Sequence, residues 1–342
     1  MTTSLSKTPE MITAEGQRLA QHWSRYGQDQ LDSYLIQDVE HPSINPQSTL
    51  IRAFVIDRLF PGEFVDIIEE ELFFAACACH VLQANRQGRL RELFEAVRNT
   101  KADAALPEFL RRGFRLVTGR RFDLEQLIAG LAKAITLGFE HFSSPFQDVW
   151  RRQFQGRSAT APRIIELGCG SANDYRFWDA YGIAPQVDYV GIDVCEANIS
   201  NARSRFPKIR FLTGDACCID EQDRSFDVVL ACDLLEHLSP AALDAALVEI
   251  ERLAGDEVWL SLFNASDAAA HDFQPVDDYH WNTLSLSETS RHLGAAGFST
   301  EVVSIADVLE QRFPGYRHYN RAAHILIGRR DVNGPPIRPV KA

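Results

Sequence analysis

The sequence predicts an α/β fold, in which a seven-stranded, mostly parallel sheet with helices on both faces follows an all-α N-terminal region. Two patterns carry this prediction. From Arg163 onward, short apolar runs alternate with helical stretches, which is typical of parallel strands joined by crossover helices. Before residue 160 the apolar residues recur at helical spacing, and no strand alternation is found.

Seven strands and their connecting helices can be placed from these patterns. Strands are expected at 163–167, 187–193, 209–213, 226–232, 257–263, 298–305 and 323–328. Helices are expected from the turn at 168–170 to about residue 180, and over 196–206, 240–253 and 286–296. Because the last two strands are close in sequence, we expect them to form an antiparallel end of the sheet.

The chain around this sheet divides into further expected parts. Residues 1–48 are polar and broken by prolines, and we expect an N-terminal segment that either packs onto the main body or covers the pocket as a lid. Residues 49–155 are expected to be a helical domain that acts as a substrate lid or forms a homodimer. Its helices are predicted at 50–59 (capped by Ser48), 63–87, 90–98, 107–118 and 123–142. The α/β domain is expected to cover 156–330, followed by a C-terminal tail at 331–342.

Composition restricts the class of protein. Of 342 residues, 45% are hydrophobic and 24% are charged, which is ordinary for a soluble globular protein. No apolar run approaches the roughly 20 residues that span a bilayer, and no signal pattern is found at the N-terminus. We therefore expect a cytoplasmic protein without a membrane partner. The seven cysteines lack paired C-x-x-C spacing, so buried free thiols are expected rather than a metal site.

The net charge of −12 is concentrated in the second half, where residues 156–342 carry 17 basic and 27 acidic side chains. An acidic domain is a poor electrostatic match for a phosphate backbone. Nucleic acid is therefore not expected as a partner or substrate.

The stretch from Arg163 to Asp174 predicts a buried strand that turns sharply into a helix. Gly168 and Gly170 allow backbone conformations and a close ligand approach that a Cβ atom would obstruct. The amides at the start of the helix would then face a ligand. A dinucleotide fingerprint requires a third glycine where this chain has Asn173, which argues against an NAD-dependent oxidoreductase.

This pattern resembles a known family at several positions. Glu166-x-Gly168-x-Gly170-x-Ala172 is similar to the first motif of class I S-adenosylmethionine-dependent methyltransferases, whose fold is Rossmann-like. Four further segments match that family in order and spacing over residues of about 156–330. They are Asp193 at the end of strand two, Gly214-Asp215-Ala216, the run from Ala231 to Leu238, and Ala295-Ala296-Gly297-Phe298.

The resemblance implies S-adenosylmethionine as the cofactor and assigns its contacts. Asp193 would bind the ribose hydroxyls, and Asp215, beside Ala216, would accept from the adenine amine. Glu166 would contact the amino-acid end, directly or through water. Gly168 and Gly170 would form the turn beneath the cofactor. Asp233 would contribute from the segment after strand four.

Candidate catalytic residues follow strands four and five. His237 is a candidate general base, because an imidazole titrates near neutral pH; a structural hydrogen bond is the alternative. Tyr279 and His280 lie where a parallel sheet opens its ligand crevice, and His280 is a second candidate base. A metal site formed by His271, Asp277 and His280 is not expected, because the spacing matches no known metal motif.

The expected activity is methyl transfer to an oxygen, nitrogen or carbon atom of a small molecule. Methylation of a peptide or protein carboxylate is one alternative. A non-catalytic protein that binds the cofactor and regulates or scaffolds a partner is another. Asp233-Leu234-Leu235-Glu236 stands where family members that methylate exocyclic amines have an Asn-Pro-Pro-Tyr-type sequence. This difference argues against those substrates.

Overall fold

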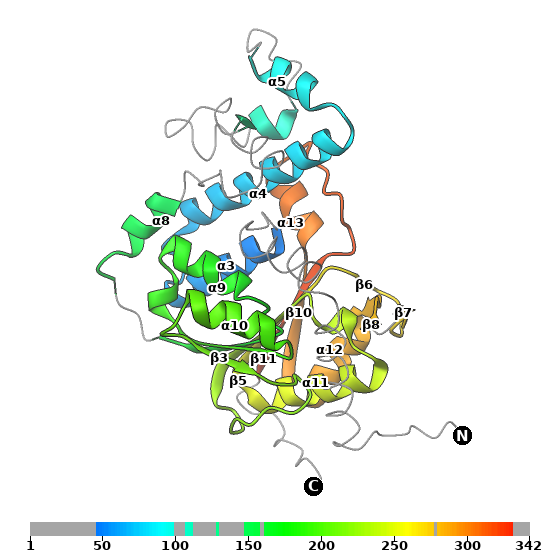
Figure 1. Ribbon diagram of the computed structural model, residues 1–342. Helices are drawn as coiled ribbons and strands as arrows, with labels where there is room; N and C mark the ends of the chain where they lie inside the picture. Colours follow the sequence, from blue (N-terminus) through cyan, green and yellow to red (C-terminus); the bar gives the residue numbers. More distant parts are fainter. Residues whose placement is uncertain are drawn as a thin grey trace.

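The structure is a computed structural model that describes residues 46–98, 107–111, 128–129, 147–157, 161–276 and 279–330. A seven-stranded sheet forms its centre, as the sequence predicts (Figure 1). The strands are β1 (Arg163–Leu167), β2 (Asp188–Asp193), β3 (Arg210–Thr213), β4 (Phe226–Cys232), β5 (Ala254–Leu262), β10 (Phe298–Ser304) and β11 (His324–Arg330).

The strand order is β10-β11-β5-β4-β1-β2-β3. The pairs among β1 to β5 are parallel, whereas β11 is antiparallel to both β5 and β10. The predicted antiparallel end is therefore confirmed. The later strand, β11, lies inside the sheet, and β10 forms its edge.

Alternate residues of each strand face two separate apolar layers, which is the period of two that a strand dictates. Ile164 and Trp259 face one layer, whereas Ile165 and Val258 face the other. The first layer lies under α9 (Asn173–Tyr181), α10 (Glu196–Arg205) and helices from the N-terminal region. The second lies under α11 (Pro240–Leu253) and α12 (Leu286–Ala295). The sheet thus has helices on both faces.

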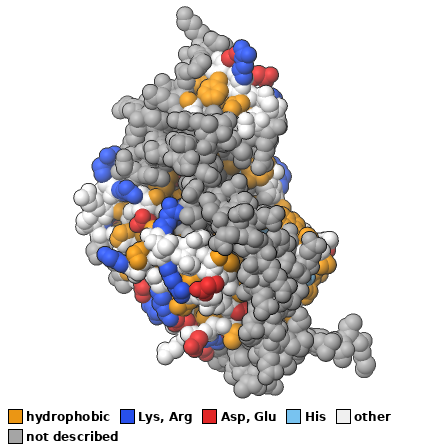
Figure 2. Space-filling view, in the orientation of Figure 1, with side chains coloured by type: hydrophobic (Ala, Val, Ile, Leu, Met, Phe, Trp, Pro, Cys, Tyr) orange, Lys and Arg blue, Asp and Glu red, His pale blue; other side chains and the backbone are white. Residues whose placement is uncertain are grey.

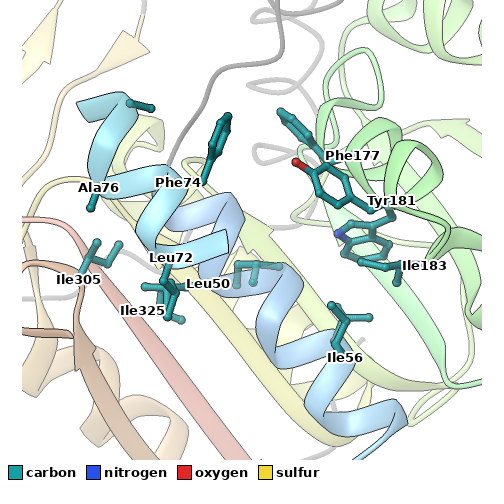
Figure 3. Packing of buried hydrophobic residues seen from close by; sticks show 14 of the residues in the cluster. Leu50, Ile56, Leu72, Phe74, Ala76, Phe177, Tyr181, Ile183, Ile305 and Ile325 are labelled. Carbon is teal, nitrogen blue, oxygen red and sulfur yellow. The ribbon is translucent and has the colours of Figure 1, made fainter. Parts of the chain in front are cut away.

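The N-terminal helices in the described residues are α3 (Pro46–Leu59), α4 (Val65–Arg86), α5 (Leu90–Arg98) and α8 (Gln147–Phe154). Leu50 of α3 and Leu72 of α4 lie beside Ile325 of β11 (Figure 3). The Phe54 ring meets the Trp259 ring edge-on, with centroids 6.3 Å apart. These helices therefore share one apolar core with the sheet.

Helix α3 begins at Pro46, so the prediction of Ser48 as its N-cap is wrong. Proline is well tolerated in the first turn, where its missing amide hydrogen is not needed. Of the predicted helix 107–118, the described part (107–111) is helical over 108–111. The predictions for residues 1–45, for most of the helix at 123–142 and for the tail at 331–342 lie outside the described residues.

Helix α8 (Gln147–Phe154) lies where no helix was predicted. Three further elements, all after β5, were also not predicted. Helix α13 (Ile305–Arg312) follows β10 directly, and the side chain of Ser304 caps it by accepting from the Asp307 amide at 3.2 Å. A hairpin pairs β7 (Pro275–Val276) with β8 (Tyr279–His280). A second small sheet pairs β6 (Ala265–Ser266) with β9 (Leu284–Ser285). Each of these three elements follows β5 or β10, and both strands end at the same edge of the sheet as β1.

Among the described helices, none is both long and apolar enough to cross a membrane. On the face drawn in Figure 2, basic and acidic side chains of the described residues both occur, interspersed with apolar ones.

Candidate functional site

The candidate site lies at the carboxyl edge of the parallel strands. Strands β1 to β5 all end at this edge, because each pairs in parallel with its neighbour. The direction of strand order changes between β1 and β4, since β2 lies on one side of β1 and β4 on the other. In open α/β sheets, ligands bind at such a switch point.

The glycine turn after β1 has the backbone geometry that its sequence predicts. Gly168 and Gly170 have φ values of 73° and 54°, and Ala172 reaches 67° before α9 begins. A Cβ atom on Gly168 would lie 3.0 Å from the Leu234 side chain, whereas one on Gly170 would lie 3.6 Å from the side-chain nitrogen of Asn173. Gly168 therefore lets β1 pack against the turn after β4, and Gly170 leaves room for a ligand.

Asp193 lies at the end of β2 and holds the glycine turn. Its Oδ2 accepts from the Gly170 amide at 2.9 Å, and its Oδ1 accepts from the Cys195 amide at 2.8 Å. The Asn198 side chain donates to Oδ1 at 3.3 Å. Burial raises the pKa of Asp193, and these three hydrogen bonds oppose that shift. A carboxylate has about four lone-pair directions, so Asp193 keeps the capacity to accept from another donor.

Asp215 and Ala216 lie after β3, in a turn joined to Asp193. The Gly214 amide donates to the Asp193 carbonyl at 3.0 Å. The Asp215 Oδ1 accepts from the Cys217 amide at 2.9 Å, and Ala216 packs at the margin of the second apolar layer. Thus the structure brings together the glycine turn, Asp193 and Asp215, all of which the sequence assigned to one site.

Glu166 lies deeper than these residues and is 2% exposed. It accepts a short hydrogen bond from the Tyr189 hydroxyl. Ligand atoms of Glu166, Asp174 and Cys232 lie within 4.8 Å of one another. Burial, and then the neighbouring Asp174 carboxylate, raise the pKa of Glu166 well above its usual range. A positive group placed here would be favoured, because it would stabilise the charged forms of the two acids and oppose the rise in the pKa of Glu166.

On the other side of the switch point, Asp233 and Glu236 shape the turn after β4. Asp233 has a φ of 50°, a conformation that Asp tolerates better than most residues, and its amide donates to the Ser261 carbonyl at 2.9 Å. Glu236 is fully buried, and its Oε1 accepts from the Phe263 amide at 2.6 Å. Burial raises the pKa of Glu236 to about 8, with the Asp233 charge as the second cause. Glu236 thereby joins the turns after β4 and β5.

His237 forms an aromatic cluster with Phe263 and Trp281. Its ring centroid lies 5.6 Å from that of Phe263 and 5.4 Å from that of Trp281, and those two rings are 4.9 Å apart. Trp281 is 46% exposed, so one side of the cluster faces solvent. The His237 Nδ1 atom lies 3.1 Å from the His280 carbonyl oxygen. Because a carbonyl only accepts, this contact is a hydrogen bond in the tautomer that carries a proton on Nδ1.

The catalytic roles of His280 and Tyr279 stay predictions. His280 meets His237 through its backbone carbonyl, and this contact says nothing of the base role predicted for its side chain. The side chain of Tyr279 lies outside the described part of the structure, as does Asp277. His271 is held by the chain itself: its Nδ1 accepts from the Ser285 amide at 3.0 Å.

Sequence reasoning missed two residues that organise the site. Asn198 of α10 contacts both Asp193 and Ser171: its side-chain nitrogen donates to Asp193, and its Oδ1 accepts from the Ser171 hydroxyl at 3.2 Å. Asn282 is fully buried and hydrogen-bonds the segments after β4 and β5. A signal existed for Asn198, which lies in the first turn of a helix that follows a predicted ligand-binding acid. A single asparagine in a loop gave none for Asn282.

Comparison with known proteins identifies this region. Residues 164–256 match a family model described as a methyltransferase domain. This span contains the glycine turn, Asp193, Asp215 and the turn after β4 that carries Asp233 and His237. These residues therefore correspond to a methyltransferase domain. The resemblance stated from the motifs is therefore confirmed, and S-adenosylmethionine is supported as the cofactor of the methyltransferase domain.

Two mycobacterial proteins that are similar to this chain are both named as probable S-adenosylmethionine-dependent methyltransferases. A probable S-adenosylmethionine-dependent methyltransferase from Mycolicibacterium smegmatis is 25% identical over 142 residues, which are 40% of this chain and 52% of that protein. One from Mycobacterium tuberculosis is 26% identical over 146 residues, covering 41% and 49%. The chain thus spans about half the length of the curated relatives it matches.

Solved structures give a more distant likeness. The 1,6-didemethyltoxoflavin-N1-methyltransferase of Burkholderia thailandensis has a TM-score of 0.39 and 18% identity, covering 54% of this chain and 76% of that one. An S-adenosylmethionine-dependent methyltransferase from Mesorhizobium loti also has a TM-score of 0.39, with 16% identity over 55% and 99% of the two chains.

Proposed function

We propose that the protein transfers the methyl group of S-adenosylmethionine to an oxygen, nitrogen or carbon atom of a small molecule. One observation carries the proposal: the Asp193 carboxylate, fixed by the Gly170 amide at 2.9 Å, joins the glycine turn to the end of β2 at the sheet's switch point. The aromatic cluster of His237, Phe263 and Trp281 stands across that point, on the β4 and β5 side.

The residues on the β1 to β3 side fit the cofactor. Asp193 keeps acceptor capacity for ribose hydroxyls, and Asp215 can accept from an exocyclic amine. The absence of a side chain at Gly170 permits close approach of the ligand to the turn. The buried Glu166 and Asp174 favour the cofactor's positively charged amino group. The bound cofactor supplies an activated methyl group on a sulfonium.

The residues on the β4 and β5 side can manage the acceptor. Burial lowers the pKa of His237, and the hydrogen bond to the His280 carbonyl opposes this effect. His237 is therefore neutral at physiological pH, with its proton on Nδ1 and a lone pair on Nε2. Such a nitrogen can take a proton from the acceptor's nucleophile. Phe263 and Trp281 offer ring faces to a small organic molecule.

The test measures binding and turnover separately with the full chain. We expect S-adenosylmethionine and S-adenosylhomocysteine to bind in isothermal titration calorimetry, and an NAD⁺ titration to show no binding. A panel of hydroxylated, amino and enolisable small molecules, with acidic peptides included, is then assayed for S-adenosylhomocysteine formation. Release of the product with a small molecule supports the proposal. Turnover with the peptides alone favours a peptide carboxylate acceptor, and binding without any turnover favours a regulatory or scaffold protein.

A further inference from the structure

Asn282 is a fully buried polar residue that uses each of its hydrogen-bonding groups. Its backbone amide donates to the Glu236 carbonyl at 2.9 Å, and its side-chain nitrogen donates to the Leu238 carbonyl at 2.7 Å. Its side-chain oxygen accepts from the Gln274 amide at 3.1 Å, and its carbonyl accepts from the Asn264 side chain at 2.9 Å. Buried asparagines need such partners, because an unsatisfied polar group costs about 1–3 kcal/mol.

These contacts enclose His237. Asn282 binds the carbonyls of the two residues that flank His237 in the chain, on either side of the candidate base. Two residues before Asn282, the His280 carbonyl accepts from the His237 Nδ1 at 3.1 Å. Thus segment 280–282 holds segment 236–238 at three consecutive points. We call these three contacts the clamp; they include the one between the His237 Nδ1 and the His280 carbonyl oxygen.

The remaining contacts of Asn282 fix the clamp to the sheet and the hairpin. Asn264, which donates to the Asn282 carbonyl, also donates to the Thr283 hydroxyl at 3.0 Å and lies two residues after β5. Gln274 precedes β7 of the hairpin, and its carbonyl accepts from the Trp281 amide at 2.8 Å. Asn282 therefore relates three segments, which follow β4, follow β5 and form the base of the hairpin.

We propose that Asn282 is a positioning residue, which holds the His280 carbonyl against His237 and thereby fixes the Nδ1–H tautomer of the imidazole. This proposal rests on the proposed function, in which His237 accepts the acceptor's proton. In the fixed tautomer, Nδ1 keeps its proton, and Nε2 provides the lone pair. The proton leaves the acceptor's nucleophile for Nε2 and passes to solvent after methyl transfer, which restores the same tautomer.

The alternative tautomer explains why positioning is needed. Free neutral histidine in water favours the proton on Nε2, where it would block the lone pair on that side. A carbonyl that accepts from Nδ1 reverses this preference, because a buried carbonyl and a buried N–H each lose a partner otherwise. The second ring nitrogen of a working histidine is commonly set by such a partner.

The tautomer of His237 can be measured directly by NMR spectroscopy. The full chain, free of cofactor, is labelled with ¹⁵N-histidine, and long-range ¹H–¹⁵N spectra are recorded near pH 7.5. Loss of one signal set in His237→Asn assigns the residue. We expect the wild-type His237 to have a protonated Nδ1 and an unprotonated Nε2. In Asn282→Ala, we expect a shift toward the Nε2–H tautomer. With an acceptor that turns over, kcat should fall about tenfold or more, while the cofactor Kd changes less than about twofold.

A matched control separates positioning from lost stability. Gln186 is another buried amide, and its side-chain nitrogen donates to the Arg157 carbonyl at 3.1 Å. It lies just before β2, at the edge of the sheet opposite the candidate site. Gln186→Ala should lower the melting temperature and leave the His237 tautomer unchanged. An unaltered tautomer in Asn282→Ala would overturn the proposal.

The wild-type spectrum is a second test, which does not depend on the folding of Asn282→Ala. An Nε2–H tautomer of His237 in the wild-type protein contradicts the proposal even if Asn282→Ala is insoluble. The tautomer measurement needs no turnover. A protein that binds no cofactor but shows the clamped tautomer would therefore refute the proposed function and leave the assigned geometry standing.

Discussion

The two halves of the candidate site are built by different kinds of contact. On the β1 to β3 side, the groups proposed to bind the cofactor lie at the ends of neighbouring strands: Asp193 accepts from the amide two residues later and from the Gly170 amide, 23 residues earlier in the chain. On the β4 and β5 side, His237 is set by a carbonyl 43 residues away and by an asparagine beyond it. The cofactor half therefore depends on the pairing of two neighbouring strands, whereas the acceptor half depends on contacts between loops that lie further apart in the chain.

The strongest test of this difference replaces His237 with two amides. In His237→Asn the side-chain nitrogen can still donate to the His280 carbonyl, whereas His237→Gln places its amide nearer the Nε2 position. Neither amide takes up a proton near neutral pH. We expect both variants to lose roughly 10²–10⁴-fold in kcat, with cofactor affinity retained. Steady-state kinetics and calorimetry provide the measurements.

The pH profile adds to this test. Because burial lowers the pKa of His237, the wild-type kcat/KM should fall only as the pH drops through a value below 6.5. This acid limb should be absent in His237→Asn. A near-normal rate in His237→Asn together with a large loss in His237→Gln would instead indicate a purely structural hydrogen bond.

The cofactor half is tested by Asp193→Asn. The substitution replaces one carboxylate oxygen with an NH₂ group, which cannot accept from the backbone N–H that the oxygen bound. A charge-assisted contact to the ribose is also lost. We expect the Kd for S-adenosylhomocysteine to rise roughly 100-fold, measured by calorimetry. Glu196→Gln removes an exposed charge three residues further on and serves as the control. Equal effects of the two substitutions would contradict the assigned role of Asp193.

The junction of the two halves is tested by alanine at each glycine of the turn. Both Gly168 and Gly170 have positive φ, so alanine costs roughly 1–2 kcal/mol at either position. Only at Gly168 does the new Cβ also press on Leu234, from the turn after β4. Chemical denaturation should therefore show the larger loss for Gly168→Ala, and Leu234→Ala should relieve part of it. Gly170→Ala should mainly weaken cofactor binding. Identical losses without relief would contradict this coupling.

The last prediction concerns Glu236, whose pKa is raised to about 8 in the folded protein. Between its ordinary value of 4.5 and about 8, the folded state keeps a proton that the unfolded state releases, so stability falls as pH rises. The slope is roughly 1 kcal/mol per pH unit. Glu236→Gln retains an acceptor for the Phe263 amide and lacks this slope. Parallel stability curves for wild type and variant from pH 5 to pH 8 would contradict the raised pKa.

Much of the fold could be predicted because its signals are local. Periodicity and the glycine turn placed all seven strands of the sheet, most within one or two residues, since each strand is an apolar run bounded by turns. The start of β5 was missed by three residues, because Ala254 and Gly255 do not read as a strand; both lie against Phe226 of β4. Helix α13 was missed because the apolar run of β10 passes into the helix at Ile305.

The acceptor half shows the limit of that approach. The sequence placed His280 near the site, but the backbone carbonyl rather than the side chain makes the described contact with His237. Asn282 and Phe263 have no motif around them, and their roles depend on pairings between segments far apart in the chain. Hydrogen bonds of this kind become visible only when the sheet has brought the segments together.

The place of β11 has a consequence for synthesis of the protein. The last described strand inserts between β5 and β10, and so it supplies two ladders rather than extending a finished sheet. In a nascent chain that has left the ribosome up to residue 320, β5 has an open hydrogen-bonding edge and β10 has no neighbouring strand. Such edges recruit other chains. Loss of residues 324–330, for instance through a premature stop codon, would therefore divide the sheet and favour aggregation and degradation over a shortened but working enzyme.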